Sequence, residues 1–158
     1  DYKFVIPTVE TTKKYLRGEV NKWDIRPELV PAAQRYYTYA KSYIAIAASG
    51  TVSAELAILH IPTIVVYKMN AFTMMLAKLL VKIKWVSLVN ILLNKSVYPE
   101  LLGDDANPEN IIHQVEKLSE SKHRQKMISE LKSADKMWRR GGNKTASRVI
   151  ADDIMKSF

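Results

Sequence analysis

The sequence predicts an α/β protein built on a parallel sheet and followed by a helical C-terminal segment. Short apolar runs alternate with helical segments over about the first 90 residues, which is typical of a layered α/β sheet. In the middle of this region, apolar runs over 43–48 and 62–67 flank a Gly turn and a helical segment over 52–60. Two strands joined by such a helix are parallel, and their crossover is right-handed.

The elements before this central unit follow from apolar runs and from the positions of proline. We expect a buried strand, a helix, a short extended piece and a second helix, over 3–8, 9–20, 24–30 and 31–41. Pro31 would stand at the first position of that second helix, where its missing N–H costs nothing. The helix contains Tyr36, Tyr37 and Tyr39, for which packing is the expected role, because too few basic residues lie between them for stacking on nucleic acid.

The elements after the central unit begin with a strongly apolar stretch. We expect a helix capped by residues 70–73 and running to about 83, a strand over 85–88 that ends near Asn90, and a loop over 99–105. Helices over 107–118 and 121–140 follow, and Gly141-Gly142 separates them from a final helix that starts at 143. An apolar stripe on the second of these helices contains Met127, Leu131 and Trp138.

Composition narrows the classes of partner. The 158 residues are 47% hydrophobic, enough for a core, and contain no cysteine, which excludes disulfides and thiolate metal sites. The three histidines lack metal-ligand spacing, so we expect no metal and no cofactor. A formal charge of +8 favours an anionic partner: nucleic acid, nucleotide or anionic lipid. The chain opens on a strand-like run without an initiator Met or a signal-peptide pattern, so we expect a fragment of a longer protein.

Two clusters of basic residues have more than one interpretation. Lys78, Lys82 and Lys84 interrupt the apolar stretch over 71–93, which therefore does not predict a transmembrane helix. A core helix with solvated lysines and a helix on an anionic membrane surface both remain open. The cluster Lys122, His123, Arg124 and Lys126 is expected to be a solvated face, so no nucleic-acid partner is predicted.

The turn at residues 49–51 is the main candidate binding site. A helix that begins at Ser49-Gly50-Thr51 presents free backbone N–H groups and the positive end of its dipole, and phosphate is the usual ligand there. Glu55 lies about one turn further in, with no basic residue within four positions, so its carboxylate could accept hydrogen bonds from sugar hydroxyls. A simple helix cap, worth about 1 kcal/mol, explains the same residues, and both interpretations stay open.

Asn90 is a second candidate, because it would stand at the carboxyl end of a strand. In open parallel sheets, ligands bind outside those strand ends. Glu100 lies in the following loop, where an acid at the start of a helix would interact favourably with the helix dipole by a few tenths to about 1 kcal/mol.

Four motifs together resemble the C-terminal half of lipid-A-disaccharide synthase, a glycosyltransferase with two facing Rossmann-like domains (the GT-B fold). They are Ala48-Ser49-Gly50-Thr51 with Glu55, Pro62-Thr63-Ile64-Val65-Val66-Tyr67-Lys68-Met69, Val86-Ser87-Leu88-Val89-Asn90-Ile91-Leu92 and Pro99-Glu100-Leu101-Leu102. Their order and spacing match over roughly residues 2–112. The Ser-Gly-Thr piece is shared with other glycosyltransferases, whereas Val-Ser-Leu-x-Asn after Tyr-Lys-Met is more specific.

The resemblance implies a Rossmann-like nucleotide-sugar domain over 1–106, with helices on both faces of its sheet, and a helical extension over 107–158. The first strand of the domain would be absent. The implied reaction transfers 2,3-diacylglucosamine from its UDP donor onto 2,3-diacylglucosamine 1-phosphate, with inversion, and gives lipid A disaccharide 1-phosphate and UDP. The departing UDP gathers negative charge, which donors at a helix N-terminus stabilise without a metal.

The resemblance also implies roles for residues. The turn Ser49 to Thr51 would meet the diphosphate, Glu55 the ribose hydroxyls, and Asn90 would line the cleft. Tyr67, Lys68 and Glu100 are further donor-site candidates. The chain lacks the N-terminal domain that should bring the acceptor and the general base, so no catalytic residue is assigned and no turnover is expected from this chain alone.

Localisation and assembly are implied as well. The resemblance implies a peripheral protein at the cytoplasmic face of the bacterial inner membrane, and dimers that form by exchange of C-terminal segments. Gly141-Gly142 could be the hinge for that exchange, but a plain loop is the interpretation that the sequence favours. Two alternatives remain: a basic membrane-surface module without catalysis, and another UDP-sugar enzyme such as a peptidoglycan glycosyltransferase or an epimerase.

Overall fold

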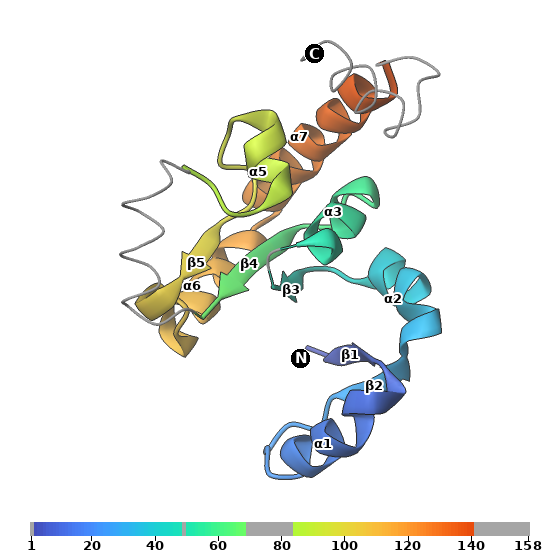
Figure 1. The fold of residues 1–158 in the computed structure, drawn as a ribbon. Coiled ribbons are helices and arrows are strands. Elements are labelled where there is room, and N and C mark those ends of the chain that lie inside the picture. Colours follow the sequence, from blue (N-terminus) through green and yellow to red (C-terminus); the bar gives the residue numbers. More distant parts are fainter. Residues whose placement is uncertain (1, 49, 69–83, 141–158) are drawn as a thin grey trace, which may run out of the picture.

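Parallel strands form two sheets in the computed structural model, which describes residues 2–48, 50–68 and 84–140, without the side chains of 136–140. One sheet pairs β1 with β2, and the other has the order β3–β4–β5 (Figure 1). The strands are β1 (Val5–Thr8), β2 (Glu28–Pro31), β3 (Ala45–Ala47), β4 (Thr63–Tyr67) and β5 (Glu100–Leu102). The predicted α/β class with a parallel sheet is confirmed.

Helices connect and cover these strands. They are α1 (Glu10–Val20), α2 (Arg35–Lys41), α3 (Thr51–Ile58), α5 (Leu88–Leu93), α6 (Pro108–Ser119) and α7 (Ser121–Arg140), with short 3-10 turns η1 (Ala32–Gln34) and η2 (Gly103–Asp105). No helix among the described ranges is long and apolar enough to cross a bilayer. The helix predicted over 70–83 and the one predicted from 143 lie outside the described residues.

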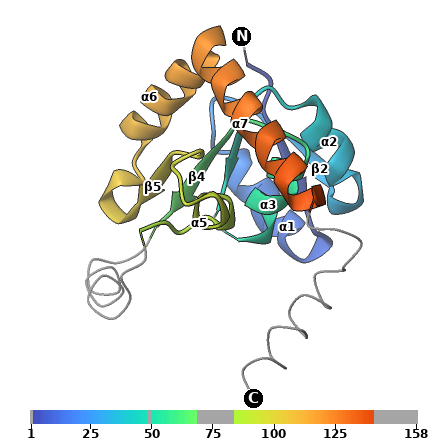
Figure 2. The ribbon, with the colours of Figure 1, turned by 90° about the horizontal axis from the view of Figure 1, so that it is seen from above.

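The core surrounds β4. Ile64 and Val65 are both fully buried, and successive strand residues point to opposite faces of a sheet, so both faces of β4 are covered. Leu118 of α6 and Leu131 of α7 belong to the same apolar cluster as these two strand residues, together with Val89 of α5. Figure 2 shows α7 (orange) on the side of the molecule that also presents α3, and the two helices are in contact. The predicted apolar stripe of α7 is therefore confirmed at Met127 and Leu131, whereas the side chain of Trp138 lies outside the described residues.

Two predicted elements are wrong. No strand forms at 85–88, because Ser87 caps α5 instead: its hydroxyl accepts a hydrogen bond from the Asn90 N–H at 3.2 Å. The segment over 99–105 is not a loop, because Glu100–Leu102 is the third strand of the larger sheet and pairs with β4. Only two apolar residues mark this strand in the sequence, which is too short a run to predict it.

Two helix boundaries differ from those predicted from the sequence. Pro31 does not open a helix, since it is the last residue of β2 and pairs with Thr8; the 3-10 turn η1 then separates it from α2, which begins at Arg35. The helix α3 ends at Ile58 instead of near His60, because His60 adopts the left-handed conformation with φ 56°, which ends helices.

Candidate functional site

The turn between β3 and α3 has a backbone that only glycine adopts readily. Gly50 is the N-cap of α3, with φ 132° and ψ −155°, and no side chain caps the helix from this position. Ser53 donates its hydroxyl to the Gly50 carbonyl at 2.7 Å, inside the first turn. Thr51 is the first helical residue and not a cap. The conformation of the helix start is thus set by the backbone and not by a capping side chain. Ser49 lies outside the described residues.

The conformation of Gly50 leads to a prediction. We expect Gly50→Ala to lower the free energy of unfolding by about 1–3 kcal/mol, because an L-residue is strained at this φ and ψ. An added Cβ at Gly50 meets nothing within 4 Å, so the whole cost comes from the backbone. Gly18→Ala is the matched control: Gly18 lies inside α1, also with open space around it, and should gain about 0.5–1 kcal/mol. Urea denaturation measures both, and losses of equal size would contradict the assignment of strain to Gly50.

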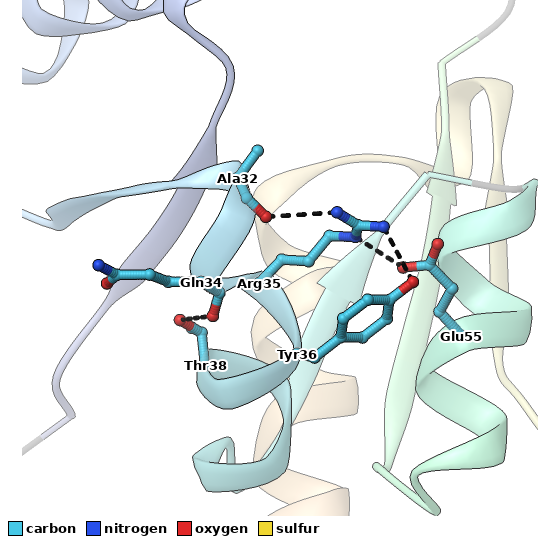
Figure 3. A network of polar contacts seen from close by, with 6 residues as sticks. All are labelled: Ala32, Gln34, Arg35, Tyr36, Thr38 and Glu55. Atoms are coloured by element: carbon cyan, nitrogen blue, oxygen red, sulfur yellow. Dashed lines mark hydrogen bonds and ion pairs between the residues drawn. The ribbon is translucent and has the colours of Figure 1, made fainter.

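Glu55 forms an ion pair with a residue that is distant in the sequence. Arg35, the first residue of α2, approaches it with Nε 3.3 Å from Oε2 (Figure 3). Both helices follow strands of the parallel sheets, α2 after β2 and α3 after β3, which brings their first turns to the same edge. The Glu55 side chain is 26% exposed. A carboxylate accepts about four hydrogen bonds, so Arg35 leaves it capacity for a ligand.

Two tyrosines of α2 complete this cluster. Arg35 donates from Nη2 to the Tyr36 hydroxyl at 2.9 Å and from Nη1 to the Ala32 carbonyl at 3.4 Å (Figure 3). The Tyr36 and Tyr39 rings pack edge to face, with centroids 6.2 Å apart. Burial, followed by the nearby Glu55 carboxylate, raises the pKa of Tyr39. Tyr36 and Tyr39 therefore pack beside the Arg35–Glu55 pair, in agreement with the role predicted for them. The packing role predicted for Tyr37 is wrong, because Tyr37 is 65% exposed.

Tyr67 and Lys68 lie at the same sheet edge as the turn. Tyr67 ends β4, the strand paired with β3, and both it and Lys68 are exposed. The structure thus brings the start of α3 and the end of β4 to one carboxyl edge, where parallel sheets bind ligands.

Asn90 and Glu100 lie elsewhere, in a buried network around the start of α5. The Asn90 side chain donates to the Tyr98 carbonyl and to Glu100 Oε1, both at 2.8 Å, and accepts from the N–H groups of Val97 and Tyr98, both at 2.9 Å. These four bonds use the whole capacity of the amide. Asn90 is fully buried, so the free protein does not present it to solvent.

Glu100 caps α5 from the neighbouring strand. Its carboxylate accepts from the backbone N–H of Val86 at 2.9 Å and of Ser87 at 2.8 Å. An acid at a helix start is favourable, as its sequence position had suggested, although the helix precedes Glu100 instead of following it. Asn90 and Glu100 therefore fix α5 against β5, the strand next to β4.

Sequence reasoning missed Arg35 as a site residue. The topology did contain a signal. Helices that follow parallel strands start at the same edge of the sheet, so the first residue of one such helix can contact the first turn of another. Within the described ranges, no group of three or more His, Asp or Glu could hold a metal ion.

A family model described as lipid-A-disaccharide synthetase matches residues 1–151. The chain belongs to the lipid-A-disaccharide synthetase family. A lipid-A-disaccharide synthase of Paramagnetospirillum magneticum is 38% identical over 120 residues, which cover 75% of this chain and 31% of the relative. That of Rhodospirillum centenum is 31% identical over 157 residues, covering 98% of this chain and 39% of the relative. That of Acinetobacter baylyi is 49% identical over 77 residues, 49% of this chain and 19% of the relative.

Membership of the lipid-A-disaccharide synthetase family confirms the predicted resemblance and extends it beyond residue 112, where the motifs stop. The chain spans between about a fifth and two fifths of the length of these three relatives. These three relatives are named as synthases of the lipid A disaccharide.

Proposed function

We propose that this chain supplies the UDP-donor site of a lipid-A-disaccharide synthase. The observation that carries the proposal is the uncapped start of α3 at Gly50, which lies beside Glu55 at the carboxyl edge of a parallel sheet. Amide groups at this start would bind the diphosphate, and Glu55 would accept hydrogen bonds from the ribose hydroxyls. Ser49 and Thr51 flank Gly50 in the sequence, and Tyr67 and Lys68 would border the site.

The proposed reaction transfers 2,3-diacylglucosamine from UDP-2,3-diacylglucosamine to 2,3-diacylglucosamine 1-phosphate. A hydroxyl oxygen of the acceptor attacks the anomeric carbon as the bond to UDP breaks, which inverts the configuration in one step and gives lipid A disaccharide 1-phosphate and UDP. The acceptor's proton passes to a base that we assign to the N-terminal domain of the family and to no residue here. The amides of α3 would stabilise the charge that develops on UDP.

Arg35 has an indirect part in this proposal. It holds the Glu55 carboxylate through Oε2 and is itself fixed by Tyr36 and Ala32, so Glu55 is oriented before the nucleotide arrives. Asn90 and Glu100 would act by holding α5 and β5 in place, and a direct contact of Asn90 with the donor would require its present bonds to open.

Domain division, localisation and assembly are also proposals. We propose a nucleotide-sugar domain over 1–106 and a helical extension over 107–158 that packs onto the same core. The family's peripheral position at the cytoplasmic face of the inner membrane suits a substrate with acyl chains and a chain of charge +8. The proposed exchange of C-terminal segments between two copies involves residues from 141 onward, which lie outside the described residues.

A UDP titration tests the proposed function. UDP should raise the melting temperature of the chain, because it binds only the folded state, and saturation at 100 times the dissociation constant adds about 2.7 kcal/mol. Vesicles of anionic lipid serve as the second arm. Vesicle binding without any effect of millimolar UDP would favour the membrane-surface module and count against the donor site.

Glu55→Ala separates the ribose from the diphosphate. We expect UDP to bind at least about tenfold more weakly, corresponding to about 1.4 kcal/mol, because the ribose loses its acceptor. Pyrophosphate should bind unchanged or more tightly, since Arg35 is released toward the anion. Calorimetric titration measures both ligands.

Glu10→Ala is the matched control for this comparison. Glu10 also forms an ion pair, with Lys13 at 2.6 Å, but it lies on α1, which follows a strand of the other sheet. Its removal should change neither affinity. Equal losses for UDP and pyrophosphate in Glu55→Ala would remove Glu55 from the ribose site.

A further inference from the structure

The last turn of α3 ends in a conformation that is usually adopted by glycine. The His60 N–H donates to the Ala57 carbonyl at 3.0 Å, and the Ile61 N–H donates to the Leu56 carbonyl at 2.9 Å. These two bonds form a Schellman motif, in which the left-handed position favours glycine because a Cβ is unfavourable there. His60 occupies that position with φ 56°. The histidine side chain is therefore present at a backbone cost that glycine would avoid.

The His60 side chain reaches helix α7. Its Nε2 lies 3.8 Å from Asp135 Oδ2, and the two side chains are 27% and 18% exposed. Asp135 follows Ala134, which is 1% exposed, and comes four residues after Leu131, which is 0% exposed. This spacing places Asp135 beside the buried face of α7, and α7 contacts α3. The His60–Asp135 pair therefore lies where two helices that are distant in the sequence meet.

A neutral imidazole leaves this contact incomplete. The Nε2 atom of His60 is buried and forms no hydrogen bond with a described residue, because 3.8 Å is longer than a hydrogen bond. Without a proton, Nε2 would direct its lone pair at a carboxylate oxygen, and with the proton it would be a donor without an acceptor. Both neutral forms leave a buried polar atom unsatisfied, which is unfavourable.

Protonation of His60 makes the contact attractive. An imidazolium is positive and donates from both ring nitrogens, so Nε2 and the Asp135 carboxylate attract each other. The end of α3 adds a second attraction, because the partial negative charge at a helix C-terminus favours a cation. The partial exposure of the His60 side chain limits the opposing cost of removing the cation from water. The charged form of His60 is thus the one that joins α3 to α7.

The other charged groups around His60 do not change this balance. The strands β3 and β4 and the helix α5 also contact α3, and they carry no acidic or basic side chain. On α7, the side chains from 136 onward lie outside the described residues. The remaining charged groups of α3 and of the adjoining part of α7 are paired elsewhere or exposed: Glu55 with Arg35, Glu130 with Lys95, and Lys132 in solvent.

We propose that His60 and Asp135 form a pH-dependent latch between the end of α3 and the second half of α7. At acidic pH the imidazolium holds the carboxylate and the two helices are fastened together. As the pH rises through the range in which histidine titrates, between about 5 and 8, the attraction is lost and the second half of α7 opens more often. The latch lies at the opposite end of α3 from Gly50, so it does not depend on the proposed donor site.

A double-mutant cycle tests the latch. Asp135→Asn removes the charge at nearly constant size, and His60→Asn introduces a residue that tolerates the left-handed conformation. The parent, both single variants and the double variant are unfolded with urea at about pH 5.5 and about pH 7.5, within the range in which histidine titrates. The coupling between the two positions, as a factor in the folding equilibrium constant, should be at least about threefold larger at the lower pH.

Titration of all other groups cancels in this cycle, so the pH dependence of the coupling belongs to the pair. A coupling that is equal at both pH values, or larger at the higher pH, would overturn the latch. If one single variant does not fold, the other is compared with the parent, and its loss of stability should again be at least about threefold greater at the lower pH. A loss that is independent of pH would overturn the latch in that case.

His123→Asn is the matched control. His123 also approaches a carboxylate, that of Glu120 at 2.9 Å, but the two side chains are 38% and 65% exposed and only three residues apart. Solvent screens such a pair, so its removal should alter the pH dependence of the folding equilibrium constant by less than about twofold. An effect as large as that of Asp135→Asn would overturn the proposal, because any surface histidine would then act as the latch does.

Amide exchange measured by NMR shows whether the effect lies on α7. At about pH 5.5, where the imidazolium predominates, Asp135→Asn should lower the protection of the Ala134 amide by at least about threefold. The Leu16 amide on α1 should keep its protection, because α1 packs outside the α3–α7 contact. Unchanged protection of Ala134, or equal losses at Ala134 and Leu16, would refute the latch. None of these measurements uses UDP, so their outcome is independent of the donor-site proposal.

Discussion

Asn90→Ala should lower the free energy of unfolding by about 3 kcal/mol or more. The substitution leaves buried donors and acceptors without partners, and each such group costs about 1–3 kcal/mol. The groups concerned are the N–H of Val97, the N–H and C=O of Tyr98 and one oxygen of Glu100. For a domain of this size the melting temperature should fall by roughly 6–12 °C, which a thermal scan by circular dichroism measures.

Asn94→Gly is the matched control. Asn94 ends α5 with φ 46° and is exposed, and glycine adopts this conformation without strain, so stability should change by less than about 0.5 kcal/mol. Comparing these two variants also distinguishes a structural role of Asn90 from a direct contact with the donor. An alanine variant that melts like the parent but no longer binds UDP would show that Asn90 contacts the donor and that its buried bonds are dispensable.

Leu131→Ala should cost about 2–5 kcal/mol, the range for a buried leucine that leaves a cavity. Leu131 lies on α7, is 0% exposed and packs in one cluster with Ile64 of β4 and Val89 of α5. Because the helix shares its core with the sheet, the loss should appear as a single shifted transition. Urea denaturation followed by circular dichroism and by tryptophan fluorescence measures it, and the two signals should coincide.

Ile112→Ala on α6 is the control, since Ile112 is 57% exposed and its truncation should change stability by less than about 0.5 kcal/mol. Two separate transitions in Leu131→Ala would mean that the helices after residue 107 unfold independently of the sheet. That result would support a structural boundary near residue 106 and remove the shared core as a source of stability.

The sequence predicted those elements whose signals are local. Val5–Thr8 and Thr63–Tyr67 are apolar runs of strand length, Asn107 caps α6 by accepting from the Asn110 N–H, and the Gly50 turn separates a strand from a helix. The start of α3 was predicted for the same reason, because a Ser-Gly-Thr sequence between an apolar run and a helical segment is typical of a turn from a strand into a helix.

The errors arise where partners distant in sequence decide the structure. Val-Ser-Leu has strand character, but Glu100 binds the N–H groups of Val86 and Ser87 from 14 and 13 residues away and turns the segment into a helix start. The Arg35–Glu55 pair spans 20 residues and depends on both helices starting at one sheet edge. Asn90 was correctly singled out as unusual, but its partners Val97 and Tyr98 could not be named before the fold was known.

The open edges of β1 and β3 have a practical consequence for anyone handling the isolated polypeptide. Each of these two strands has one strand neighbour among the described residues. Unpaired strand edges template intermolecular β-pairing, and hence aggregation, so concentrated samples should self-associate through these two strands first. Pro7, the three-residue length of β3 and the mutual repulsion of chains carrying +8 all oppose this. High salt screens that repulsion, and low-salt buffers should therefore keep the protein dispersed for the longest time.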